Sequence, residues 1–192
     1  AAICILALSA TTPCINLFGD THIIENGSCE MEIILPQNVH KADAEAANTL
    51  ARELAKLACG GNIKVSFFDG NSRPKTKIFF KKCATSQPPQ ELSSIRVKSD
   101  SGNIEIEYPD ESRAMNAVGI FLRKFCGIRF YAPGELGTHF EKKKNLSIPD
   151  GESEFKDAFF SIGFYAPTKD AKRRGEVSRW LKLNGAHLTA GN

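Results

Sequence analysis

Few residues of this 192-residue chain have the types and spacing that chemistry requires. The block from Arg113 to Pro149 combines an amphipathic helix, a glycine stop, an aromatic strand and a charged hairpin. It contains no nucleophile beside a base, no metal-ligand cluster and no phosphate-binding loop. The residues alone therefore indicate an α/β scaffold and no particular reaction, and we expect no catalytic residue, no metal site and no cofactor.

The six cysteines are the remaining candidates for chemistry. Cys4 and Cys14 lie in or beside the apolar start of the chain, which leaves Cys29, Cys59, Cys83 and Cys126. No pair has C-x-x-C spacing, which argues against zinc. An even number of thiols in an exported chain permits disulfides, whereas buried cysteines are often free. A bridge between Cys59 and Cys126, which both lie at the C-terminal ends of predicted helices, stays open, and the pairing cannot be read from spacing.

The first ten residues, AAICILALSA, are apolar or small, as in the hydrophobic region of a secretory signal. The run is shorter than the ~20 residues that a membrane span needs. We interpret residues 1–20 as a signal-peptide remnant clipped at its start, with a buried strand as the alternative. The protein is therefore expected to be exported, periplasmic or extracellular, with no membrane span in the mature chain.

The charge of the chain does not indicate a nucleic-acid partner. Its 25 basic and 22 acidic residues give a net charge of +3. Nucleic-acid binding requires a basic face with stacking aromatic residues. The cluster from Lys142 to Lys144 instead lies between Phe140 and a strand-like segment, as a solvated turn does.

Apolar periodicity predicts the elements of the first half of the chain. Two short strands, 21–25 and 30–36, flank the turn residues Asn26, Gly27 and Ser28 and suggest a hairpin-like opening. Apolar residues at helical spacing and the stop at Gly60-Gly61 predict a helix over 41–59. Segments 63–69 and 77–83 are typical of strands, and we expect them to lie in a sheet under that helix.

The next segments predict a second sheet region and a second helix. Strands 94–100 and 103–109 alternate apolar and charged residues, so Ile95, Val97, Ile104 and Ile106 are expected to face one side. Asp110 can cap the following helix, and Gly127 can end it in the left-handed conformation. The buried stripe of that helix is predicted to contain Ala114, Val118, Phe121, Leu122 and Phe125. The fold class is therefore α/β (α+β), a mixed β-sheet packed by two helices.

The segment FLRKFCGIRFYAPGELGTHFEKKKNLSIPD, which begins inside the second helix, resembles a known domain. It is similar to the small N-terminal domain that precedes the barrel in glycoside hydrolase family 20 hexosaminidases, bacterial alpha-glucuronidases and related glycosidase-like proteins. The resemblance covers about 21–150, with Phe130 in place of the usual Trp and Glu141 to Lys144 in place of a Pro-containing turn. The matching positions are Ala46, Ala47, Leu50, Leu54, Gly119, Phe121, Leu122, Gly127, Arg129, Tyr131, Gly137, Thr138, Leu146, Ile148 and Pro149.

The resemblance implies an organisation in three parts: the signal remnant 1–20, a hexosaminidase-like accessory domain 21–150, and 151–192 as the first elements of a (β/α)8 barrel. FKDAFFSIGFYA is similar to the first barrel strand, and EVSRWLKLNGAHLTAGN to the first barrel helix and second strand. A complete barrel needs ~200 residues, so we expect an incomplete gene product that lacks the catalytic carboxylates. In such families this domain is structural and packs on the barrel, so Arg113, Arg129 and Tyr131 are expected to be packing residues.

Three residues near the C-terminus could contribute to a sugar site if the barrel resemblance holds. His187 and Asn192 would lie on or just beyond the second barrel strand, where active sites gather. Trp180 could form a sugar platform. For His187 and Trp180 the alternative is an ordinary core residue. The implied partner is a polysaccharide or glycan bound by the barrel, while a stand-alone carbohydrate-binding or protein-interaction module remains the alternative. Self-association could occur through exposed Phe159, Phe160 and Phe164.

Overall fold

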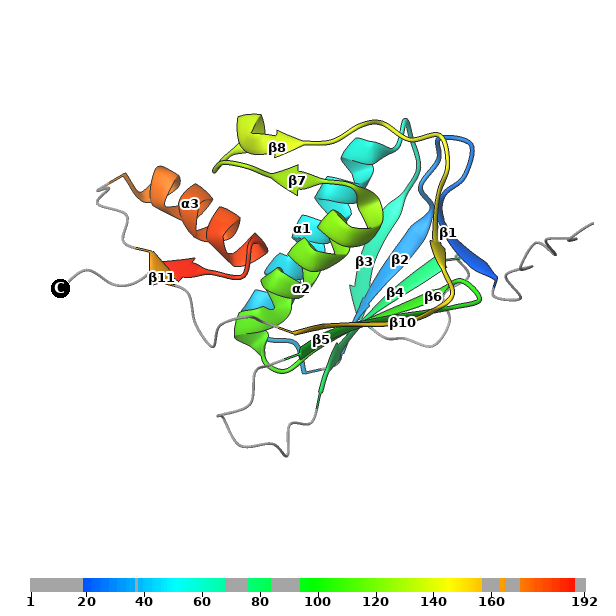
Figure 1. Cartoon of the computed structure of the whole chain (residues 1–192), viewed down its shortest axis with the longest axis horizontal. Coiled ribbons are helices and arrows are strands. Elements are labelled where there is room, and N and C mark those ends of the chain that lie inside the picture. The colour runs from blue at the N-terminus through cyan, green and yellow to red at the C-terminus, as the bar shows by residue number, and fades with distance from the viewer. Residues whose placement is uncertain are drawn as a thin grey trace, which may run out of the picture.

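The computed structural model describes residues 19–36, 38–67, 76–83, 94–156, 163–164 and 170–188. Figure 1 shows two helices side by side on one face of a sheet, with a third helix beside them. The strands are β1 (Asp20–Ile24), β2 (Met31–Leu35), β3 (Ile63–Phe67), β4 (Thr76–Lys82), β5 (Ser94–Asp100), β6 (Asn103–Tyr108), β7 (Arg129–Phe130), β8 (Thr138–His139), β9 (Leu146–Pro149), β10 (Gly151–Lys156), β11 (Gly163–Phe164) and β12 (His187–Leu188). The α-helices are α1 (Lys41–Leu57), α2 (Ala114–Phe121) and α3 (Ala171–Leu183).

The central sheet has six strands in the order β10-β5-β6-β4-β2-β3. The pairs β10–β5 and β5–β6 are antiparallel, and the pairs β6–β4, β4–β2 and β2–β3 are parallel. The sheet is therefore mixed, as predicted, and β3 and β4 both lie in it, on either side of β2. The predicted α/β class with a mixed sheet and two covering helices is confirmed.

Helix α1 forms because its local signals agree with its burial. The His40 ring accepts a hydrogen bond from the main-chain N–H of Ala42, and the Asp43 carboxylate accepts one from the N–H of His40, which together satisfy groups at the helix start. Leu50 and Leu54 are fully buried against the sheet. The helix thus packs on the sheet through one apolar stripe, as its periodicity predicted.

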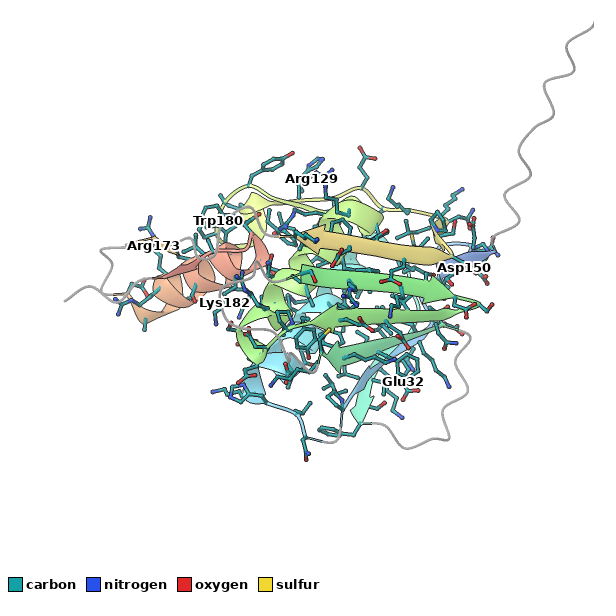
Figure 2. All side chains as sticks on the ribbon, turned by 60° about the horizontal axis from the view of Figure 1, so that its bottom comes forward. Glu32, Arg129, Asp150, Arg173, Trp180 and Lys182 are labelled. Atoms are coloured by element: carbon teal, nitrogen blue, oxygen red, sulfur yellow. The ribbon has the colours of Figure 1, made fainter. Side chains whose placement is uncertain are left out.

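The predicted hairpin over 94–109 is present, and its side chains lie as expected. Residues of β5 and β6 pair in antiparallel register, with Val97 opposite Ile106. The four apolar residues assigned to one side are all buried: Ile95, Val97, Ile104 and Ile106. Figure 2 shows the sheet face that no described helix covers. Lys98 of β5 and Glu107 of β6 alternate with the buried residues and form an ion pair at 3.1 Å.

The prediction of a hairpin-like opening over 21–36 is wrong, although the turn between the two strands is present. Asn26 and Gly27 both have positive φ, and Glu25 and Ser28 exchange two main-chain hydrogen bonds of 2.9 Å. The chain then diverges, because β1 pairs antiparallel with β9 while β2 enters the centre of the sheet. The turn residues are local signals, whereas the partner of β1 is about 125 residues away in the sequence and has no local signal.

The second helix follows its prediction and ends with a wider turn. Asp110 caps the 3-10 turn Glu111–Arg113 that leads into α2. After Phe121 the chain continues as a π-helical turn, Leu122–Cys126, and stops at Gly127 with φ 79°. Of the predicted stripe, all but Phe125 are buried, and Phe125 packs on the core at its edge. The left-handed stop at Gly127 is therefore confirmed.

The six residues after Asp150 belong to the central sheet. Strand β10 pairs with β5 along its whole length, and Phe155 contacts Phe125 with ring centroids 6.1 Å apart. The Asp150 side chain stabilises this corner by accepting hydrogen bonds from the hydroxyls of Thr21 and Ser99. The predicted boundary between 21–150 and 151–192 thus falls inside this sheet, and the other parts of the predicted division, with 1–20 as a separate segment, stay a prediction.

The four cysteines of the described region are free thiols. Cys29 and Cys126 are buried, and Cys59 is exposed. The bridge between Cys59 and Cys126 that the sequence left open is therefore absent from this structure. Burial raises the pKa of the Cys29 thiol to about 11 and also raises the pKa of Cys126.

Candidate functional site

The C-terminal part of the chain forms a β-α-β unit that consists of β11, α3 and β12. Strands β11 and β12 pair in parallel, with Gly163 opposite His187 and Phe164 opposite Leu188. Parallel neighbours require a crossover connection, and α3 supplies it. In sheets built from such units, ligands bind beyond the carboxyl ends of the strands. His187 is thus on a strand of the expected kind, one residue before the described end of β12.

Helix α3 has well-formed ends. At its start the Asp170 carboxylate accepts hydrogen bonds from the main-chain N–H groups of Lys172 and Arg173, at 2.9 Å and 3.2 Å. At its end Gly185 has φ 80°, a conformation that favours glycine. The turn therefore directs the chain sharply from α3 into β12.

Trp180 connects α3 to the segment that carries the family-like motif. Its indole N–H donates to the carbonyl oxygen of Phe130 at 3.0 Å, and its ring packs against the core. The Asn184 side-chain amide donates to the same oxygen at 3.3 Å. Trp180 and Arg129 lie on the same side of the molecule in Figure 2. The half-buried indole is thus used in packing.

Arg123, on the π-helical turn after α2, also contacts the C-terminal end of α3. Its guanidinium donates to the Leu183 carbonyl oxygen and, at 3.3 Å, to the Asn184 side-chain oxygen. Burial and then the neighbouring Arg129 guanidinium lower the pKa of Arg123. Arg129 in turn donates to the Arg123 carbonyl oxygen. Both arginines therefore bind main-chain oxygens at helix ends, where the partial negative charge of the helix dipole favours cations.

Gly119 allows α2 and α3 to approach each other closely. A Cβ atom at this position would lie 1.9 Å from the Leu183 carbonyl oxygen. Asn116, one turn earlier on α2, faces Gly185 and is only 4% exposed. The end of α3 thus packs directly on the backbone of α2 at Gly119, where any side chain would clash.

The structure describes the three predicted site residues only in part, and their role in binding a sugar stays a prediction. Asn192 lies outside the described residues, and for His187 the structure describes the main chain alone. Trp180 is described and takes part in packing, as noted above. Phe159 and Phe160 also lie outside the described residues, and for Phe164 only the main chain is described. The structure thus places Trp180 and the main chain of His187 in one β-α-β unit.

Sequence reasoning missed the residues that hold this unit: Gly119, Arg123 and Asn184. Gly119 had a usable signal, because an isolated glycine in an apolar helix pattern often marks a close approach of another segment. Arg123 and Asn184 had none, because arginine and asparagine are common near helix ends. Tyr131 was expected to pack, but it is 71% exposed and its ring lies beside His139, with centroids 6.5 Å apart.

The described polar side chains of this junction bind main-chain oxygens. The donors of Trp180, Asn184 and Arg123 are directed at carbonyl oxygens, as given above. Among the described residues, no three His, Cys, Asp or Glu side chains are arranged to hold a metal ion. None of the described helices has the length and apolar character to cross a membrane. The described hydrogen bonds of the junction thus connect the C-terminal end of α3 to the α/β domain.

Comparisons with known proteins give matches among solved structures. No family model matches the chain, and no curated protein matches it. The chitobiase of Flavobacterium johnsoniae, a family 20 glycoside hydrolase, aligns with a TM-score of 0.45 and 11% identity over 77% of this chain and 20% of that enzyme. The family 20 exo-β-N-acetylglucosaminidase of Vibrio harveyi aligns at 0.42 and 15% identity, over 77% of this chain and 19% of that enzyme.

A family 89 glycoside hydrolase of Clostridium perfringens is also similar, with a TM-score of 0.47 and 10% identity over 76% of this chain and 16% of that enzyme. This chain therefore spans about a fifth or less of the length of these enzymes. At these values the similarity assigns neither an activity nor a substrate to this chain.

Proposed function

We propose that the chain contains a non-catalytic accessory domain of an exported glycosidase-like protein that degrades polysaccharide or glycan. In this proposal the mixed sheet with α1 and α2 forms the accessory domain. The β11–α3–β12 unit is the beginning of the barrel. The carboxylates that cleave the glycosidic bond would belong to later barrel strands, outside these 192 residues.

One observation carries the proposal: a parallel β-α-β unit directly follows the domain that bears the hexosaminidase-like motif. A two-stranded parallel sheet is not a stable structure by itself, because parallel strands are normally buried on both faces. The pairing of β11 with β12 thus favours a larger parallel sheet. His187 and Asn192 would then lie at the barrel edge where substrates bind, and Trp180 would support that edge from behind.

A second candidate is a stand-alone carbohydrate-binding or protein-interaction module. It is favoured by the exposure of Tyr131 and Leu136, which are 71% and 106% exposed on the segment between β7 and β8. Aromatic rings on a surface can stack on sugars, and exposed apolar side chains often mark an interface. In this case binding would need no further domain.

The two candidates differ in what the gene encodes on either side of these residues, so we would sequence the genomic DNA across both ends of the reading frame. The proposal expects a signal sequence upstream and a barrel with a carboxylate pair downstream, and the product of the whole gene should hydrolyse chromogenic glycosides that the 192-residue chain leaves intact. A stop codon directly after Asn192, together with binding of a glycan by this chain alone, would refute it in favour of the module.

A further inference from the structure

We infer that the α/β domain holds the β11–α3–β12 unit by gripping the C-terminal end of α3, so that both parts fold and unfold as one cooperative body. Gly119 and Arg123 are the positioning residues. They determine the direction in which the chain leaves α3 and enters β12. The inference deepens the proposed function, on which it rests for the meaning of the β-α-β unit as a barrel start.

The Leu183 carbonyl at the end of α3 is bound by the domain. The N–H of Gly185 donates to the carbonyl oxygen of Lys182 at 3.1 Å, and the next N–H donates to that of Leu181 at 2.9 Å. This is the Schellman pattern, which satisfies the carbonyls of the last turn in part. The Leu183 oxygen is not included in it, and the Arg123 guanidinium donates to this oxygen. A helix end bound in this way has a fixed orientation, because an unsatisfied buried carbonyl is costly.

The contact with Gly119 adds a steric requirement to the hydrogen bond. Leu183 is 4% exposed and belongs to the hydrophobic core of the domain. With a Cβ at position 119 only 1.9 Å from the Leu183 oxygen, any side chain there must displace the helix end. Gly119 of α2 and Arg123 of the following π-helical turn are four residues apart, and both lie against the Leu183 carbonyl, so one bare surface and one donor act on the same residue.

A second attachment point prevents α3 from rotating about its end. Trp180 and Asn184, one turn apart on α3, both donate to the Phe130 carbonyl oxygen on β7. Gly134, farther along the same segment, lies near the Glu176 carboxylate, 3.6 Å from the position of a Cβ. The segment after β7 therefore follows α3 over about two turns.

The grip on α3 has a direct optical readout, because Trp180 is the single tryptophan of the chain. Its fluorescence reports on the docking of α3, while far-UV circular dichroism reports on the secondary structure of all elements, α3 included. The test compares Gly119→Ala, Arg123→Ala and Arg123→Lys with a control, Lys124→Ala, at an exposed position of the same turn. Limited trypsin digestion at Arg173, on the exposed first turn of α3 in Figure 2, gives an independent measure.

We expect Gly119→Ala to shift the Trp180 emission to the red without denaturant and to speed tryptic cleavage of α3 at least tenfold, with the circular dichroism retained. Alanine is a better helix former than glycine, so α2 itself should not weaken. Arg123→Ala should cause a smaller red shift, Arg123→Lys should restore most of the wild-type emission, and Lys124→Ala should match the wild type. In urea, wild-type fluorescence and circular dichroism should change at one midpoint.

The inference is overturned by wild-type Trp180 emission in both Gly119→Ala and Arg123→Ala, or by wild-type fluorescence that changes at a lower urea concentration than the circular dichroism. If Gly119→Ala prevents folding altogether, the comparison of Arg123→Ala with Arg123→Lys tests the inference by the same fluorescence and proteolysis measurements. These measurements use the 192-residue chain and no substrate. A failed grip on α3 is therefore distinguishable from a failed assignment as a glycosidase-like protein.

Discussion

Replacing Tyr108 by phenylalanine should weaken the attachment of α1 to the sheet by a predictable amount. The Tyr108 hydroxyl donates to the Asp43 carboxylate at 3.0 Å, and the two residues are 0% and 3% exposed. Burial and the neighbouring carboxylate raise the pKa of Tyr108, so the hydroxyl remains a donor at neutral pH. The phenylalanine ring keeps the edge contact with Phe80, whose centroid is 6.0 Å away. The change thus removes one hydrogen bond and leaves a buried carboxylate oxygen without its donor.

A hydrogen bond to a charged group contributes ~1.5–3 kcal/mol, so we expect Tyr108→Phe to lower the free energy of unfolding by about 2 kcal/mol. For a chain of this size that corresponds to a fall in Tm of about 4–8 °C. Urea titration and thermal melts followed by circular dichroism measure both quantities. Tyr131→Phe is the matched control, because Tyr131 is 71% exposed and should change stability by less than about 0.5 kcal/mol. Equal effects of the two substitutions would refute the reasoning.

Other consequences of the structure are open to similar tests. Hydrogen bonds, first of all from the Thr21 hydroxyl, lower the pKa of Asp150. The contribution of Asp150 to the free energy of unfolding is therefore present above about pH 4 and is lost as the pH falls through the folded-state pKa. Asp150→Asn should flatten the acid limb of a stability–pH profile. Gly61→Ala should destabilise by about 3 kcal/mol, because φ is 120° and the new Cβ would lie 2.3 Å from the Cys29 carbonyl oxygen. Gly127→Ala, with φ 79° and an ordinary contact of 3.8 Å between the new Cβ and the Lys143 side chain, should cost about 1 kcal/mol in the same melts. Of the described thiols, exposed Cys59 should react with a thiol reagent in the native state well before buried Cys29; equal rates would contradict the burial of Cys29.

Local elements could be predicted because their signals lie within a few residues of each other. The helix over 41–57, the hairpin over 94–108 and the stop at Gly127 all follow from periodicity, turn residues and glycine. The pairing of β1 failed as a prediction because its partner β9 comes from the far end of the domain. Strand β10 was likewise assigned to the following unit, although it completes the central sheet.

The candidate site shows the same division. The type of the β-α-β segment could be anticipated from its resemblance to a barrel start, and Trp180 could be expected in the core from its helical spacing. Gly119 signalled the close approach of another segment, but neither its pattern nor that of Arg123 indicates that this segment is the end of α3. Both roles exist only when α2 and α3 are packed together, some 60 residues apart in the sequence.

The sequence by itself determined which segments of the α/β domain form its main helices and strands and which of their faces are apolar. Those properties depend on neighbours along the chain, through backbone preference and the burial of one face. The tertiary structure decided the partner of β1, the place of β10 and the attachment of α3. These depend on which distant groups meet when the core closes, where a single missing Cβ at Gly119 or one guanidinium at Arg123 determines how two segments fit.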